Sequence, residues 1–194
     1  MRWLPQPVHA LPEVEPVVPI SRPQPFDDPA FLFEPQYQGS RALLYVRGPG
    51  AWFQTTAGGV ALGFEELAWA VRRQLMDETL ILDGVVIALD LDGKTDPRAR
   101  LSGGSQLHYA AFDVLWRGRR DVRHRPLWWR KLALEQVIPR SGPILSRAYA
   151  VPEHGRALFR AAERLHYHGI VAKRKSDPYQ EGVVWYRVTV RRPG

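Results

Sequence analysis

The stretch Phe33–Arg41 places polar side chains at alternate positions, with Glu34, Gln36 and Gln38 followed by Gly39 and Arg41. The Gln36 amide can donate and accept hydrogen bonds. It cannot act as a nucleophile, because its nitrogen lone pair is delocalised into the carbonyl. Taken alone, these residues fit either a functional motif or ordinary polar positions at a strand edge or turn. The rest of the chain must decide between these two interpretations.

Basic and aromatic residues are interleaved between positions 116 and 131. The basic set is Arg117, Arg119, Arg120, Arg123, Arg125, Arg130 and Lys131, and Trp116, His124, Trp128 and Trp129 lie among them. Such interleaving suits phosphate contacts and base stacking. We predict that the arginines bind nucleic acid, whereas for the tryptophans packing into the core is an equal alternative.

The histidines give weaker signals. His166 and His168 form a His-x-His pair that could chelate a metal ion on a strand, while His9, His108 and His154 have no ligand spacing. Surface or packed histidines are the commoner outcome. We therefore predict no metal site.

The stretch around Gln36 resembles the nucleotide-attachment motif of the ATP-dependent DNA ligases, Glu-x-Lys-x-Asp-Gly-x-Arg. Glu34, Gly39 and Arg41 match this motif, whereas Gln36 stands in place of the lysine and Gln38 in place of the aspartate. In the family, the lysine amine attacks the α-phosphate of ATP and holds AMP. The resemblance thus implies a ligase-like chain that is inactive because Gln36 replaces the nucleophile.

Further segments resemble the family's later motifs in the family's order. They are Gln54–Gly58, Leu82–Val86, Ala110–Leu115, His168–Lys173, Ser176–Tyr179 and Trp185–Thr189. The glycines and the apolar residues of these segments match the family's motifs. Four polar positions depart from the pattern: Val85 and His168 replace glutamates, Thr56 replaces an arginine and Thr189 a lysine. Hence we predict no catalytic residue in this chain.

The resemblance implies an α+β nucleotidyltransferase fold, the ATP-grasp-like DNA ligase adenylation fold, with antiparallel sheets flanked by helices. It also implies a remnant pocket that requires no cofactor and binds ATP or AMP weakly. In the family the Phe112 ring would stack on adenine, and the predicted pocket residues are Glu34, Arg41, Phe112, Lys173 and Arg187. An oligonucleotide-binding barrel normally follows the last motif; the sequence ends at Gly194, so we expect no barrel to close over the site.

Charge is segregated along the 194 residues. Residues 1–97 carry 7 Lys and Arg against 13 Asp and Glu, a net of −6, whereas residues 98–194 carry 20 against 7, a net of +13. Such asymmetry favours a polyanion as partner of the second half. The resemblance to DNA ligases implies that this partner is DNA more than RNA. No apolar run or signal peptide points to a membrane. The absence of cysteine fits the cytoplasm, with association with the nucleoid as an extension.

The spacing of apolar residues predicts helices around Phe64–Leu75, after Pro126 and around Leu158–Leu165, the last ending near Gly169. Strands are predicted at 41–47, 51–55, 79–90, 107–113, 169–173 and 185–190. Helices interspersed with short strands independently favour an α+β domain. Nine of the 17 prolines fall within residues 1–35 and predict a stretch without regular helix or central strand. Phe31 and Phe33 are expected to begin the first packed strand. We expect residues 1–30 to form an arm, lying along a domain of residues 31–194 or mobile, and to offer a docking segment for a repair protein.

Three hypotheses follow. The first is a non-catalytic ligase-like protein in DNA binding or repair. The second is a protein-interaction scaffold on the same fold, which nucleic-acid affinity would distinguish from the first. The third is an active ATP-dependent ligase or nucleotidyltransferase with a relocated nucleophile such as Lys173.

Overall fold

Successive side chains of a strand point to opposite faces of the sheet. A long apolar strand therefore places apolar side chains on both faces. The computed structural model describes residues 11–89, 106–165 and 167–190. In β3 (Ser40–Arg47), Ala42, Leu44 and Val46 join one core cluster, whereas Leu43 and Tyr45 join another. Both faces of this sheet are therefore buried.

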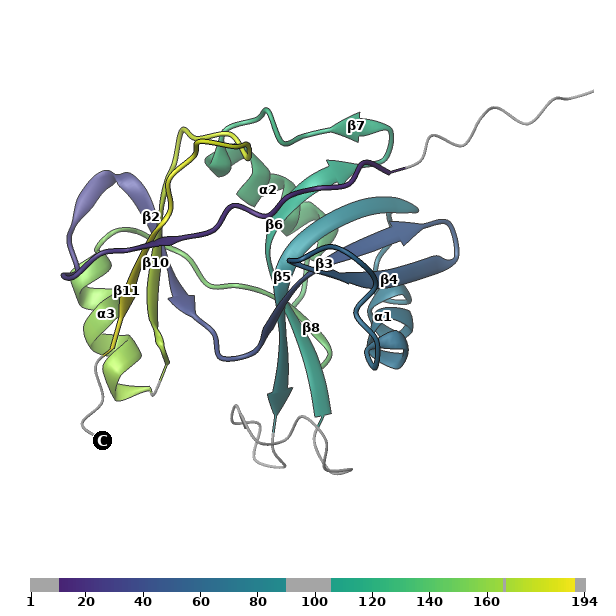
Figure 1. Ribbon diagram of the computed structural model, residues 1–194, viewed down its shortest axis with the longest axis horizontal. Coiled ribbons are helices and arrows are strands. Elements are labelled where there is room, and N and C mark those ends of the chain that lie inside the picture. Colours follow the sequence, from purple (N-terminus) through teal and green to yellow (C-terminus); the bar gives the residue numbers. More distant parts are fainter. Residues whose placement is uncertain (1–10, 90–105, 166, 191–194) are drawn as a thin grey trace, which may run out of the picture.

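Two sheets carry the fold (Figure 1). The larger follows the order β4-β3-β5-β6-β7, with β8 beside β6. Its other strands are β4 (Gly50–Thr55), β5 (Thr79–Leu89), β6 (Gln106–Arg117), β7 (Arg120–Asp121) and β8 (Leu145–Arg147). The smaller follows β1-β11-β10-β2-β9, formed by β1 (Ile20–Ser21), β2 (Asp28–Gln36), β9 (Val151–Glu153), β10 (Gly169–Arg174) and β11 (Tyr186–Thr189).

In the described part of the chain, three helices cover the outer faces of the sheets. α1 (Glu65–Arg72) and α2 (Leu127–Val137) pack on the larger sheet, and α3 (Gly155–Arg164) packs on the smaller one. The remaining cluster lies between the sheets and contains Leu43, Ile81, Phe112 and Trp185. This layered α+β arrangement confirms the predicted fold class. The pairings are antiparallel except for two short parallel ones, β1 with β11 and β6 with β8.

The expected elements are present within one to a few residues of their predicted bounds. The strand around 107–113 is longer than predicted, and α3 ends at Arg164 rather than near Gly169. Pro126 stands at the N-cap of α2, as predicted for a proline that opens a helix. The end of the 79–90 strand, His9 and His166 lie outside the described residues.

The prediction that prolines exclude a central strand from residues 1–35 is wrong for β2. This strand contains Pro29 and Pro35 and has a neighbour on each side. Proline is tolerated because the register with β9 is irregular between Asp28 and Leu32, and because Pro35 lies beyond the residues that β9 pairs with.

The described part of the arm lies along the body. It runs from the larger sheet to the smaller one in Figure 1. Val14 and Val17 are buried in the cluster between the sheets, and Ile20–Ser21 pairs with β11. Among the described residues, no helix combines the length and apolar composition needed to cross a membrane.

Candidate functional site

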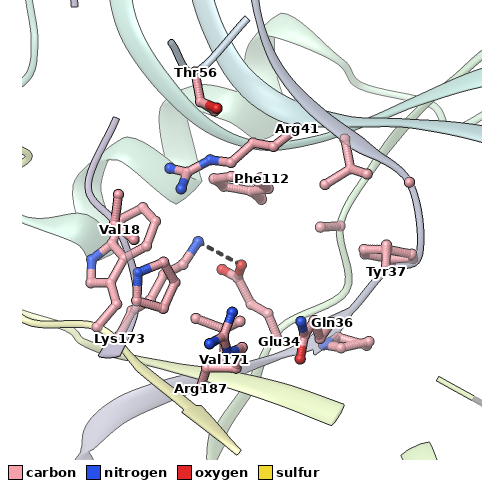
Figure 2. A pocket seen from close by; sticks show the side chains of 16 residues that line it. Val18, Glu34, Gln36, Tyr37, Arg41, Thr56, Phe112, Val171, Lys173 and Arg187 are labelled. Carbon is pink, nitrogen blue, oxygen red and sulfur yellow. Dashed lines mark hydrogen bonds and ion pairs between the residues drawn. The ribbon is translucent and has the colours of Figure 1, made fainter. Parts of the chain in front are cut away.

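A cavity of about 330 Å³ opens between the two sheets (Figure 2). Side chains from β2, β10 and β11 line one side, and those from β3, β5 and β6 line the other. The lining residues are Val18, Pro19, Glu34, Pro35, Gln36, Tyr37, Gly39, Arg41, Thr56, Val85, Phe112, Ala148, Val171, Lys173, Trp185 and Arg187.

Strand register explains why distant residues meet on the smaller sheet. Val171 in β10 is the partner of Glu34 in β2 and of Arg187 in β11, so these three residues form a row. Side chains two residues apart share a face. Gln36 and Lys173 therefore lie on the same face as Glu34 and Val171, toward the cavity.

Glu34 bridges two lysines in the interior. Its Oε2 accepts a hydrogen bond from Lys173 Nζ at 2.7 Å, and its Oε1 is ion-paired with Lys131 from α2. Burial opposes ionisation of the carboxyl, but the two ammonium groups outweigh it and hold the pKa of Glu34 below its usual value. The carboxylate is therefore committed to the two lysines.

Burial has the opposite result for Lys173. Loss of water lowers its pKa to about 8, although Glu34 works against this, and the second ammonium of Lys131 adds to the lowering. One carboxylate shared by two ammoniums cannot fully compensate for both. The site thus keeps a positive excess beside the cavity.

Cations contact the Phe112 ring, the residue predicted to stack on adenine. Lys173 Nζ lies 3.9 Å from the centroid of the Phe112 ring and 4.1 Å from that of Trp185. The Arg41 guanidinium carbon is 5.4 Å from the Phe112 centroid, and Figure 2 shows Arg41 above the ring and Lys173 below it. A base that stacks on Phe112 would have to displace one of these groups.

Arg41 is fixed by a buried carboxylate. Its Nε and Nη2 donate to Oδ1 and Oδ2 of Asp83 at 3.1 and 2.7 Å. The Tyr179 hydroxyl donates to Asp83 Oδ2 at 2.7 Å, and Arg41 Nη1 donates to the Val17 carbonyl at 2.7 Å. Asp83 has no exposed surface, so this pair sets the direction of Arg41.

Three polar atoms in the lining are buried without a hydrogen-bond partner among the described residues. One of them, Oε1 of Glu34, is ion-paired with Lys131. The other two are Oε1 of Gln36, an acceptor, and Nε of Arg187, a donor. Both residues come from the smaller sheet and lie near Glu34 in Figure 2. A ligand that presents a donor to one and an acceptor to the other would satisfy both.

All five predicted pocket residues, Glu34, Arg41, Phe112, Lys173 and Arg187, line this one cavity. That they bind a nucleotide stays a prediction. Of the positions that depart from the motif pattern, Gln36, Thr56 and Val85 line the cavity, whereas Gln38, His168 and Thr189 are not among the lining residues.

Arg130 is wrongly placed in the predicted nucleic-acid set. It is fully buried, and its Nε and Nη2 donate to Asp113 at 2.8 and 2.9 Å. Asp113 is fully buried in β6 and needs a buried cation as partner. Arg130 therefore has a structural role in the core.

The other predicted arginines lie at the surface to different degrees. Arg119, Arg120 and Arg125 are exposed. Arg117 and Arg123 are partly buried and paired with Asp77 and Asp121. The interleaved tryptophans are divided as well, since Trp116 and Trp129 pack against the core and Trp128 is half exposed.

Within the described ranges, no group of three or more His, Asp or Glu side chains could hold a metal ion.

Comparison with known proteins identifies the family. The family model for the ATP dependent DNA ligase domain matches residues 21–188. The chain belongs to this family. A DNA ligase of Pyrobaculum calidifontis is 25% identical over 168 residues, and the multifunctional non-homologous end joining protein LigD of Mycolicibacterium smegmatis is 24% identical over 157 residues.

Solved structures agree with the adenylation fold. Mycobacterial DNA ligase D complexed with ATP and MES superposes with a TM-score of 0.79 at 20% identity, over 90% of this chain and 59% of that one. Each of the two sequence matches covers 78% of this ligase domain, but only 29% of the P. calidifontis protein and 20% of LigD. The chain therefore spans less than a third of the length of these relatives.

Sequence reasoning missed three residues that hold the lining side chains Glu34 and Arg41 of the ligase domain in place. Lys131 was grouped with the basic residues between positions 116 and 131, Asp83 was only part of a motif match, and Val17 lay in the predicted arm. Asp83 carried a usable signal, because a single acid inside the apolar run of β5 requires a buried partner. The arm contact depends on a backbone carbonyl, which side-chain patterns do not reveal.

Proposed function

We propose that this chain is a DNA ligase-like domain that forms no lysyl-adenylate and serves in DNA binding, as an accessory to DNA repair. The observation that carries the proposal is Gln36, which ends β2 and lines the cavity at the position where the family motif has lysine. A phosphoramidate bond to AMP needs an amine at this place, and an amide does not supply one.

The rest of the cavity supports binding without covalent capture. Val85 lines it where the motif has glutamate and offers no ligand for a metal ion. At the cavity, four cationic side chains outnumber two carboxylates: Arg41, Lys131, Lys173 and Arg187 against Glu34 and Asp83. The nearby Asp113–Arg130 pair is neutral by itself. This excess of positive charge favours a phosphate-bearing ligand such as ATP or AMP, held weakly and released unchanged.

A DNA-binding role is supported by the surface as well as by the relatives. Arg119, Arg120 and Arg125 are exposed in the basic half of the chain, and charge of one sign attracts a polyanion over long range. The matching P. calidifontis relative is described as a DNA ligase, and by analogy we propose DNA rather than RNA as the partner.

Intact-mass spectrometry after incubation with ATP and Mg²⁺ tests the proposal. We expect the mass of the chain to stay unchanged under conditions in which an active DNA ligase gains one AMP. Detection of an AMP adduct on the wild-type chain would refute the non-adenylylating role.

A second candidate, an active nucleotidyltransferase, rests on Lys173. Its amine lines the cavity and its pKa is lowered to about 8 by burial, which leaves a larger neutral fraction than an exposed lysine has. Its hydrogen bond to Glu34 Oε2 speaks against the role, because a paired ammonium is not a nucleophile. If an adduct appears and is lost in Lys173→Gln, this candidate replaces the first.

A scaffold role on the same fold, with the arm as docking segment for a repair protein, is separated from the first by nucleic-acid affinity. Absence of DNA binding at low salt would favour the scaffold.

A further inference from the structure

The arm segment, residues 11–22, contacts the candidate pocket directly. The Val17 carbonyl accepts a hydrogen bond from Arg41 Nη1 at 2.7 Å, and the Val17 amide donates to the Tyr179 hydroxyl at 3.3 Å. Val18 and Pro19 line the cavity. Part of the space and one of the basic groups of the pocket are thus used by the chain itself.

Two pocket residues also anchor the backbone of the arm segment. The Ile20 amide donates to the Trp185 carbonyl and the Arg22 amide donates to the Arg187 carbonyl, both at 2.9 Å. Trp185 and Arg187 also line the cavity. A ligand that shifts either residue therefore disturbs the arm, and a moving arm disturbs the pocket.

Arg41 is the point of competition. Its Nε and Nη2 are occupied by Asp83, and the neutral Val17 carbonyl takes Nη1. Phosphate oxygens are stronger acceptors for a guanidinium than a carbonyl oxygen, since the hydrogen bond is then assisted by charge on both sides. The positive excess around the cavity acts in the same direction.

The arm segment is held to the body by a limited set of contacts. It pairs with β11 over only two residues, and Pro12, Pro16 and Pro19 have no amide hydrogen to donate. Val14 and Val17 are buried, but Val18 and Ile20 are 74% and 53% exposed. Its hold depends on a few hydrogen bonds, on the buried side chains of Val14 and Val17, and on Leu11, which packs against the same cluster.

We propose that the arm segment is a built-in occupant of the pocket, which a phosphate-bearing ligand must displace from Arg41. Arm docking and ligand binding then oppose one another, so any factor that holds the arm down closes the site. The inference rests on the pocket of the proposed function, but not on DNA binding or on the fate of Gln36.

A disulfide staple tests the competition within one molecule. The native chain has no cysteine, and Ile20 and Tyr186 are partners in the register of β1 and β11. In Ile20→Cys/Tyr186→Cys, oxidation locks the arm and reduction releases it. By calorimetry with ATP and with AMP, we expect the oxidised form to bind about tenfold more weakly than the reduced form.

A variant that releases the arm segment from the body gives the opposite test. Val14→Asp places a carboxylate at a buried position beside Glu13 and Glu15, so the segment should leave the body. We expect binding of AMP about tenfold tighter than in the wild type. Met76→Asp, at a position that is 90% exposed, is the control and should bind like the wild type. Circular dichroism checks that each variant remains folded.

Amide hydrogen exchange at Ile20 and Arg22 reports the arm itself. Faster exchange on addition of AMP to the wild type supports displacement, as does binding that appears only in the released forms. Equal affinity in the locked and released forms overturns the proposal, and so does absence of binding in every form. Neither result affects the mass-spectrometric or DNA-binding tests, so failure here is separate from failure of the proposed function.

Discussion

Lys173 and Glu34 occupy adjacent strands of the smaller sheet, with Nζ of the lysine 2.7 Å from Oε2 of the glutamate and both side chains almost fully buried. Lys131 reaches the same carboxylate from α2. The three groups connect β2, β10 and α2 at the cavity, so the protonation of Lys173 is linked to the stability of the fold.

The free energy of unfolding should rise with pH between about 8 and about 10 because of Lys173. Burial lowers its pKa to about 8 in the folded chain, whereas an unfolded lysine titrates near 10.4. Between these values the unfolded chain holds a proton that the folded chain has lost, so raising the pH favours folding, by at most about 3 kcal/mol. Urea denaturation at several pH values measures the slope.

The matched variant is Lys173→Met, in which the rise should disappear. Measurements should stop near pH 9.5, because burial raises the pKa of Tyr37 to about 12 and tyrosines of this kind lower stability once unfolded tyrosine ionises near pH 10. An equal slope in wild type and variant would show that Lys173 does not titrate in this range.

Removal of the carboxylate that holds Arg41 should destabilise the protein strongly. Asp83→Asn leaves the guanidinium without its bidentate partner next to the core, and we expect a loss of about 3 kcal/mol in unfolding free energy. Asp27→Asn breaks an exposed contact to Arg156 at 3.9 Å and should change stability by less than about 0.5 kcal/mol. Similar losses in the two variants would contradict the role of Asp83 as anchor.

How far the sequence could predict this molecule differs between backbone and side chains. The strands around Leu43 and Ile81 were predictable because each is a short run of apolar residues next to a glycine-containing turn. The family resemblance then brought Glu34 and Lys173 together, although 139 positions separate them. The gathering of the five predicted residues in one cavity is a consequence of strand register that the motif order already contained.

Side-chain pairing was less accessible. Arg130 belongs by sequence to a run of arginines, yet a helix that begins at Leu127 turns it inward onto Asp113. The face of the helix on which a side chain lies decides whether it is at the surface or in the core. A run of charged residues in the sequence does not reveal that face. The arm contact was hidden for a different reason, because Arg41 recognises the backbone of Val17 rather than its side chain.

Gly39, a glycine of the attachment motif, should not tolerate a side chain. A Cβ atom there would lie 2.3 Å from the Val86 carbonyl oxygen and 2.7 Å from Cγ1 of Val85. Relief requires movement of β5, so we expect Gly39→Ala to lower the unfolding free energy by about 2 kcal/mol. Gly142→Ala, where no atom lies within 4 Å of the added Cβ, is the control. Equal stability of the two variants in thermal unfolding would argue against close packing at Gly39.

DNA affinity should depend on Arg119 and Arg120, which are exposed in the turn between β6 and β7 and at the start of β7. If both contact phosphates, reversal of their charge should weaken binding and reduce the slope of log affinity against log salt by about 2. Arg160→Glu with Arg164→Glu alters the same number of exposed charges on α3, at the far end of the molecule in Figure 1. A salt-titrated gel shift compares the two pairs. Because net charge changes equally in both, a steeper loss for Arg119 and Arg120 locates the contact, whereas equal losses would indicate attraction by overall charge alone.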